Sequence, residues 1–286
     1  METVLPKADN QVGAPAMYRP LPKPTPVQAF WERWGPTAIT IINLSVFVYL
    51  WQLAQGGAEP LIDTRWIPAP LDLANSIIKN IQNGQLLHHG VFSARTYLTG
   101  FGITIVLGVT LGIFLGLNPT IRTVTQTYVW IGYSTPMIAL LPIITVVLGF
   151  GVTAKVVVVA LQTFWPIMIN VLNGVGTVDP VLMKAGRLFG ANPFQRFRKI
   201  IIPSILPWIM TGIRVSSRRG LTGVIIAEIF GSTRGLAYFI ALNTDQRDSA
   251  DAFTGILGLM LISLIMINGL AWLEEKVTPW RQAVRL

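Results

Sequence analysis

Residues 96–117, TYLTGFGITIVLGVTLGIFLGL, form a run of apolar and small residues without a single charged side chain. A helix needs roughly 20 such residues to cross a hydrocarbon core about 30 Å thick. Further uncharged runs cover residues 38–54, 123–154 and 252–273. Because each run is close to this length or longer, the sequence predicts an all-α membrane protein.

The composition supports the same interpretation. Of the 286 residues 52% are hydrophobic and only 12% are charged, and the mean hydropathy is +0.56. A soluble domain carries about 25% charged residues, so half of the usual charge is missing. The chain has no cysteine, which excludes disulfides, thiolate metal sites and cysteine catalysis.

We place about six membrane-spanning helices, at residues 37–54, 94–117, 125–148, 155–174, 207–230 and 252–273. If the N-terminus is cytosolic, sixteen of the 22 lysines and arginines lie inside and the other six outside. An excess of basic residues marks cytosolic loops, so both termini are predicted inside. The net charge of +9 then reports membrane topology, and we expect no binding to nucleic acid.

The remaining segments flank a transmembrane domain over residues 37–276. Residues 1–36 are rich in proline and are predicted to form a cytosolic tail, and residues 277–286 form a second one. Residues 59–92 are expected outside, with a short amphipathic helix over 71–87 at the membrane interface. At its end stand His88 and His89, which we interpret as surface residues because adjacent histidines face different sides of a helix.

Two features inside the predicted spans concern helix packing. Gly108, Gly112 and Gly116 form a GxxxGxxxG ladder on one helical face, a pattern that lets helices approach closely in lipid. We favour packing within the chain over a contact between subunits. Pro136 and Pro142 each remove a helical hydrogen bond, so the third span is predicted to be kinked or interrupted. Broken helices are common where substrates pass, although a simple kink fits equally well.

Charged residues inside the spans are candidates for a substrate pathway. Glu228 is the only acidic residue in any predicted span, and a buried carboxylate is costly unless it is paired or hydrated. Arg214 and Arg218 share a helix face, and Arg218 and Arg219 lie roughly 13–18 Å along the helix from Pro207. The arginines line either an aqueous path or a cytosolic vestibule, and a positively charged path indicates an anionic solute. The predicted pathway residues are Pro136, Pro142, Arg214, Arg218, Arg219 and Glu228.

The longest inside loop, residues 178–203, reads VDPVLMKAGRLFGANPFQRFRKIIIP. Asp179 and Pro180 are a helix cap followed by proline at the first helical position. Gly190 allows a sharp turn, and Asn192-Pro193 begins a second short helix. The loop is therefore predicted to form a cytosolic helical hairpin. Its tip carries the exposed apolar residues Leu188, Phe189 and Ala191, which indicate docking onto a partner.

This loop resembles the EAA loop of bacterial ATP-binding-cassette (ABC) importer permeases, whose pattern is E-A-A-x3-G-x9-I-x-L-P. Lys184, Ala185 and Gly186 stand at its first three positions, Gly190 at the glycine, and Ile200 and Pro203 near its end. Lysine replaces the family's glutamate, so an ion pair of that glutamate with the ATPase is not expected here. The resemblance implies that the chain contacts its ATPase through Lys184, Ala185, Gly186, Leu188, Phe189, Gly190, Ala191, Ile200 and Pro203.

About three quarters of the chain, from Pro68 to Trp280, resembles the permeases for nitrate, bicarbonate, taurine and aliphatic sulfonates. Matching segments include residues 67–70, IPAP, and residues 116–119, GLNP. Arg218 and Arg219 depart from the small or apolar residues expected in that branch. The resemblance implies a permease of the type I importer fold in the bacterial inner membrane, moving a small anion.

The resemblance also implies partners. Two copies of the chain would form the pathway, two cytosolic ATPases would bind ATP and Mg²⁺, and an extracytoplasmic protein would deliver the solute. The chain itself should bind no cofactor, because it has no G-x-x-x-x-G-K-[ST] loop, and it has neither H-E-x-x-H nor G-x-S-x-G. We therefore expect no enzymatic activity. Two alternatives remain open, a permease for a neutral pyrimidine precursor and a secondary carrier.

Overall fold

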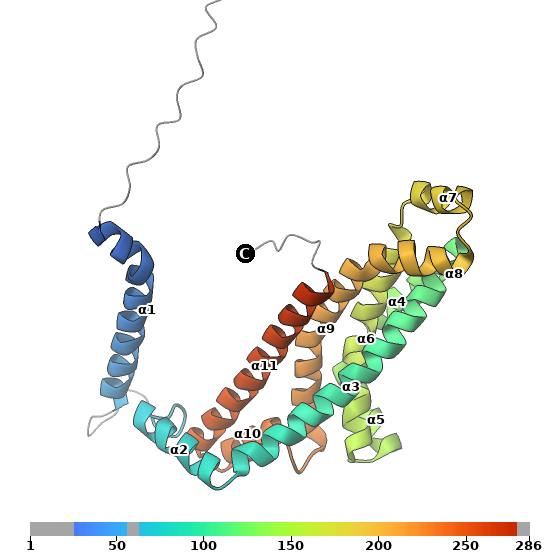
Figure 1. The fold of residues 1–286 in the computed structure, drawn as a ribbon. Helices are drawn as coiled ribbons and strands as arrows, with labels where there is room; N and C mark the ends of the chain where they lie inside the picture. Colours follow the sequence, from blue (N-terminus) through green and yellow to red (C-terminus); the bar gives the residue numbers. More distant parts are fainter. Residues whose placement is uncertain (1–25, 56–62, 279–286) are drawn as a thin grey trace, which may run out of the picture. The chain divides into compact units, whose positions relative to one another are not determined.

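The computed structural model describes residues 26–55 and 63–278, and every regular element in these ranges is a helix (Figure 1). The predicted all-α fold is thus confirmed. The elements are α1 (Pro26–Gln55), α2 (Pro70–Gln82), α3 (Gln85–Gly116), α4 (Pro119–Ser134), the 3₁₀ helix η1 (Met137–Leu140), α5 (Leu141–Leu148), α6 (Val152–Gly176), α7 (Pro180–Leu188), α8 (Pro193–Arg196), the π-helical turn η2 (Phe197–Ile201), α9 (Ile202–Gly231), α10 (Leu236–Asp245) and α11 (Ser249–Val277).

Five stretches are long and apolar enough to cross a membrane, namely Trp34–Gln55, Gln85–Gly116, Val152–Gly176, Pro193–Gly231 and Ser249–Val277. A sixth consists of two pieces, Pro119–Ser134 and Met137–Leu148, which meet at an angle of 76°. The count of about six spans is therefore confirmed. So is the predicted interruption of the third span, because the bend falls at Pro136, whose missing N–H breaks the helical ladder.

Several predicted boundaries differ from the structure. Helix α1 begins at Pro26, ahead of the span predicted to start at residue 37, while residues 1–25 and 279–286 of the two predicted tails lie outside the described ranges. Helix α3 begins at Gln85, nine residues before the predicted start at residue 94. Hydropathy marks the apolar part of a helix and not its first turns, which explains both differences.

The entry to the fifth span also differs from the prediction. The span was predicted to start at residue 207, but helix α9 begins at Ile202, contains Pro207 and carries Pro203 in its first turn. Pro203 has no N–H to donate, and the π-helical turn η2 ends two residues before it, at Ile201. The helical path from Pro193 to Gly231 is nevertheless continuous.

The core lies where α3, α6 and α9 pack together, around Tyr97, Val159, Val171 and Ile205. The glycine ladder of α3 faces α6. A β-carbon placed on Gly108, Gly112 or Gly116 would lie 3.0, 2.8 or 2.9 Å from the side chains of Ile167, Val171 or Val175, respectively. The interpretation of the ladder as packing within the chain is confirmed.

Candidate functional site

The loop over residues 178–203 forms the predicted hairpin at one end of the helical body, where Figure 1 shows α7 and α8 projecting from the ends of α6 and α9. Asp179 caps α7 by accepting a hydrogen bond at 2.7 Å from the backbone N–H of Val181. Pro180 occupies the first helical position. The local sequence thus determines where this helix begins.

Gly190 makes the turn between the two helices. Its φ of +73° lies in the left-handed region, which costs other L-residues about 1–2 kcal/mol. Ala191 donates its backbone N–H to the carbonyl of Gly186 at 2.9 Å and so closes α7. Within the described ranges, no atom beyond the two neighbouring residues lies within 4 Å of the place of a Gly190 β-carbon, so glycine is required for its conformation and not for space.

A capping box that the sequence analysis missed begins the second helix. The side chain of Asn192 accepts from the N–H of Gln195 at 2.8 Å, and the Gln195 side chain accepts from the N–H of Asn192 at 2.9 Å. The spacing N-x-x-Q was the available signal. Nearby, a β-carbon on Gly186 would lie 3.0 Å from Ile200, so the structure brings these two motif residues together.

The remaining motif residues divide between the outside and the inside of the hairpin. Leu188 and Phe189 are 87% and 90% exposed, and Lys184, Gly190 and Pro203 are also exposed. Ala185, Gly186 and Ile200 are half-buried in the hairpin. Ala191 follows Gly190 in the turn as predicted, but it is half-buried as well, so its predicted exposure is wrong.

The three arginines of α9 have separate environments. Arg214 forms an ion pair with Glu274 of α11, whereas Arg218 is exposed. Arg219 lies over the ring of Tyr133, with its guanidinium carbon 4.4 Å from the ring centroid, and donates to the Tyr133 hydroxyl. Tyr133 belongs to the last turn of α4, directly before the bend at Pro136. Pro136 and Pro142 are both exposed.

Glu228 is fully buried near the other end of α9. Its carboxylate accepts from the Ser93 hydroxyl at 2.7 and 2.9 Å and from the backbone N–H of Ala237 at 3.0 Å. Lys155, buried at the start of α6, is close enough for its charge to act on Glu228. These hydrogen bonds and this charge stabilise a carboxylate that water does not reach.

The same group of side chains caps helix α10. The first N–H groups of a helix have no partner within it, and here three of them are bonded in sequence. Gly235 donates to Nδ1 of His89 at 3.0 Å, Leu236 to the Ser93 hydroxyl at 2.8 Å, and Ala237 to Glu228. We call His89, Ser93 and Glu228 the α10 cap. His89 is therefore buried, and its interpretation as a surface residue was wrong, whereas His88 is exposed.

A second polar cluster joins α2 to α11. Asp251 accepts from Ser76 at 2.6 Å, from Asn80 at 2.8 Å and from Lys79 at 3.2 Å. The charge pattern of the spans did not reveal this cluster, because Asp251 precedes the predicted span by one residue. Ser76, Lys79 and Asn80 recur at helical spacing, which was the available signal.

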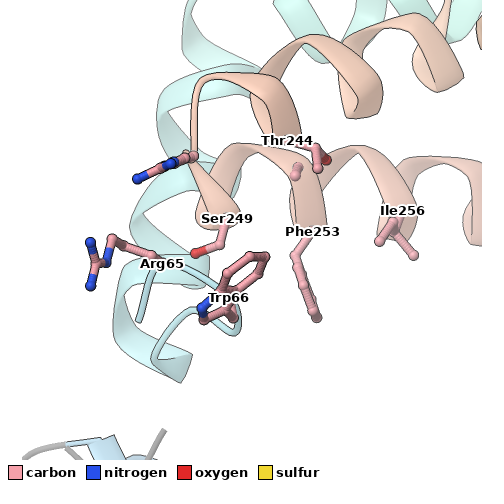
Figure 2. Close-up of a pocket in the computed structure, with 8 residues that line it drawn as sticks. Arg65, Trp66, Thr244, Ser249, Phe253 and Ile256 are labelled. Atoms are coloured by element: carbon pink, nitrogen blue, oxygen red, sulfur yellow. The ribbon is translucent and has the colours of Figure 1, made fainter. Parts of the chain in front are cut away.

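Among the pockets at the end of the body that carries α2 and α10, two have polar side chains in their walls and a third is lined by apolar residues. The first, of about 300 Å³, includes Arg65, Trp66, Ser249, Phe253 and Ile256 among its lining residues. Figure 2 shows the Arg65 side chain directed away from the Trp66 and Phe253 rings. Arg65 forms an ion pair with Asp63, and this pairing lowers the pKa of the Asp63 carboxyl group. The second pocket, of about 430 Å³, lies beside the α10 cap and is lined by polar residues.

With this geometry established, comparison with known proteins identifies the family. Residues 108–279 match the family of binding-protein-dependent transport system inner membrane components. The chain belongs to this family. It is a multi-span permease of the ABC importer class, as the hairpin motif predicted, and the secondary carrier is thereby set aside.

Individual relatives cover nearly the whole chain. It is 25% identical to the taurine transport system permease protein TauC of Escherichia coli, over 89% of this chain and 94% of the relative. It is 26% identical to the bicarbonate transport system permease protein CmpB of Synechocystis, with the same coverage. The formylaminopyrimidine transport permease protein ThiX of Halalkalibacterium halodurans is 26% identical over 76% of this chain and 86% of the relative. The permease family is thus common to relatives named for three different solutes.

Proposed function

We propose that this permease imports a small organic or inorganic anion of the sulfonate, taurine, nitrate or bicarbonate class. Two copies of the chain form the pathway in the inner membrane, with both termini in the cytosol. Two ATPases bind the cytosolic coupling loops over residues 178–206, which contain the hairpins, and supply ATP hydrolysis, because the chain lacks a phosphate-binding loop of its own. An extracytoplasmic binding protein delivers the solute.

The observation that carries this proposal is the charge of Arg218 and Arg219 in the middle of α9. Glu274 balances Arg214, but among residues 26–55 and 63–278 neither Arg218 nor Arg219 forms an ion pair with a carboxylate. Arg219 instead lies on the Tyr133 ring. A guanidinium within a membrane is costly without a partner or water, so a hydrated path that attracts anions explains its position.

The continuous helix from Pro193 to Gly231 supports a coupling role for the hairpin. It begins in the hairpin, carries Arg218 and Arg219 midway and ends three residues after Glu228. A displacement of the hairpin by an ATPase would be transmitted along hydrogen-bonded backbone to these side chains. Alternating access then requires two arrangements of this helix against α4, where Tyr133 precedes the bent segment.

Import of a neutral pyrimidine precursor is the second candidate, favoured by the similarity to ThiX. The two solutes make opposite predictions for Arg219. An anion loses its attraction when the guanidinium is removed, whereas a neutral ring still has the Tyr133 face available for stacking.

The test uses proteoliposomes that contain the permease, its ATPase and its binding protein. Arg219→Gln should lower ATP-dependent uptake of taurine or bicarbonate, whichever the binding protein binds, by about tenfold or more, because hydrogen bonds to charged groups contribute about 1.5–3 kcal/mol. Arg95→Gln, at an exposed arginine of α3, is the matched control and should keep its uptake. Uptake of a neutral pyrimidine at full rate by Arg219→Gln would support the second candidate, and unchanged anion uptake would contradict the first.

A further inference from the structure

The pocket beside the α10 cap has the composition of an anion site. Its side chains include those of Asn83, Gln85, His88, His89, Thr233 and Arg234. All of them offer hydrogen-bond donors, and no carboxylate is among the described residues that line the pocket. Arg234 is exposed there, so its guanidinium is available to a ligand. A pocket with a guanidinium, amide groups and a hydroxyl favours a small oxyanion.

His89 supplies this pocket with a buried hydrogen-bond donor. Its side chain is only 8% exposed, and its Nδ1 accepts the N–H of Gly235 at 3.0 Å. A neutral imidazole that accepts at one nitrogen carries its proton on the other, so Nε2 is the donor. Nε2 has no partner in the part of the chain that the structure describes, while the residue lines the pocket. A bound oxyanion would satisfy it.

The pocket lies at the end of the helix that begins in the hairpin. Residues 232–235 join the end of α9 to the start of α10, and Thr233 and Arg234 of this loop line the pocket. The hairpin lies at the opposite end of the continuous helix Pro193–Gly231. A change in the direction of that helix would therefore alter the spacing between Arg234 on the loop and His89 on α3.

The buried carboxylate of Glu228 does not prevent an anion from binding in this pocket. Glu228 directs its oxygens toward Ser93 and Ala237, and Lys155 balances part of its charge. The pocket at Arg65 is a weaker candidate, because Arg65 is already paired with Asp63 and directed away from the aromatic wall (Figure 2).

We propose that the pocket formed by His89, Arg234 and the polar residues around them is an entry site, which holds the oxyanion on the extracytoplasmic side before it reaches Arg218 and Arg219. This inference rests on the proposed import of an anion. This site would select anions before the solute reaches the arginines in the middle of α9, where anions are selected a second time.

The test exploits the absence of cysteine from the chain. In the full transporter with its ATPase, Thr233→Cys is labelled with a sulfonate-bearing methanethiosulfonate reagent and, separately, with its trimethylammonium counterpart. We expect faster labelling by the anionic reagent and protection by methanesulfonate. Adding Arg234→Gln should lower the ratio of the two rates by about tenfold, since one charge roughly 6 Å away in water shifts each rate about threefold in opposite directions.

Arg247→Gln is the matched control, because it removes an arginine at the same end of the body that lines the other pocket. It should leave the ratio of rates and the methanesulfonate protection unchanged. The proposed site is contradicted if Arg234→Gln leaves the ratio unchanged, or if methanesulfonate gives no protection. Anion uptake by the unmodified transporter, measured in parallel, tests the proposed function separately, because uptake without protection would overturn the entry site alone.

Discussion

Gly235 lies directly against the carboxyl group of Glu228, so that a β-carbon at Gly235 would overlap the carboxyl carbon and both oxygens. Gly235 also has a φ of +114°, in the region that favours glycine. Two separate constraints therefore exclude a side chain at this position. The contact keeps the first turn of α10 within hydrogen-bonding distance of the α10 cap.

Gly235→Ala should consequently destabilise the protein by about 3 kcal/mol or more, through steric overlap in addition to backbone strain. We expect a lower Tm for the purified permease in detergent and a loss of transport. Gly149→Ala is the matched control, since Gly149 has a φ of +73° and nothing within 4 Å of its β-carbon position. It should lose only the backbone strain of its positive φ with ψ at 177°, about 1–3 kcal/mol, without the steric overlap. If both variants lost the same free energy of unfolding, the contact with Glu228 would contribute nothing to the effect of Gly235→Ala.

Removal of the Glu228 charge gives a second prediction. The carboxylate accepts from both Ser93 and Ala237, and an amide has only one oxygen to offer. Glu228→Gln should lower transport and Tm, and Glu228→Ala should lower Tm further by leaving buried donors without a partner, at about 1–3 kcal/mol for each.

A double-mutant cycle with Ser93→Ala checks the assignment. If the cap acts as one unit, the double variant should lose less free energy of unfolding than the two single variants together. The difference should be at least about 0.5 kcal/mol. Full transport activity in Glu228→Gln would reduce the residue to a packing role.

The glycine ladder gives a third prediction. A leucine at Gly112 would meet Val171 at its first side-chain atom, so α3 and α6 would have to separate. We expect Gly112→Leu to lower the yield of folded protein and its Tm, by about 1–3 kcal/mol or more. Gly102 lies on the same helix, and its β-carbon position has no other described side chain within 4 Å. Gly102→Leu should therefore be tolerated. If the ladder instead served a contact between subunits, Gly112→Leu would dissociate the dimer and leave the Tm of the monomer unchanged.

The parts of the structure that follow from neighbouring residues could be predicted, and the hairpin is the clearest case. Asp179-Pro180, Gly190 and Asn192-Pro193 each determine a helix end through contacts within a few positions. The interruption of the third span at Pro136 has an equally local cause. The glycine ladder was also placed correctly, because small residues on one face leave only close helix packing to explain them.

The α10 cap could not be predicted, because it joins residues far apart in the chain. Ser93 and Glu228 are separated by 135 positions, and His89 and Gly235 by 146. Hydropathy and periodicity describe one helix at a time and do not show which polar side chains meet in the interior. For the same reason Glu228 was recognised as unusual without its partners, and His89 was assigned to the surface.

The last prediction concerns Gly190 in the hairpin. Because the space around its β-carbon position is empty, a substitution acts only through the backbone conformation. Gly190→Val should disfavour the left-handed turn by about 1–2 kcal/mol or more, shift the tip residues Leu188 and Phe189, and weaken co-purification of the ATPase. Asn adopts this conformation more readily than other residues, so Gly190→Asn should keep most of the binding. The Tm of the membrane helices should change little in both variants, since the hairpin tip is exposed. Normal ATPase co-purification and transport in Gly190→Val would contradict the docking role of the hairpin.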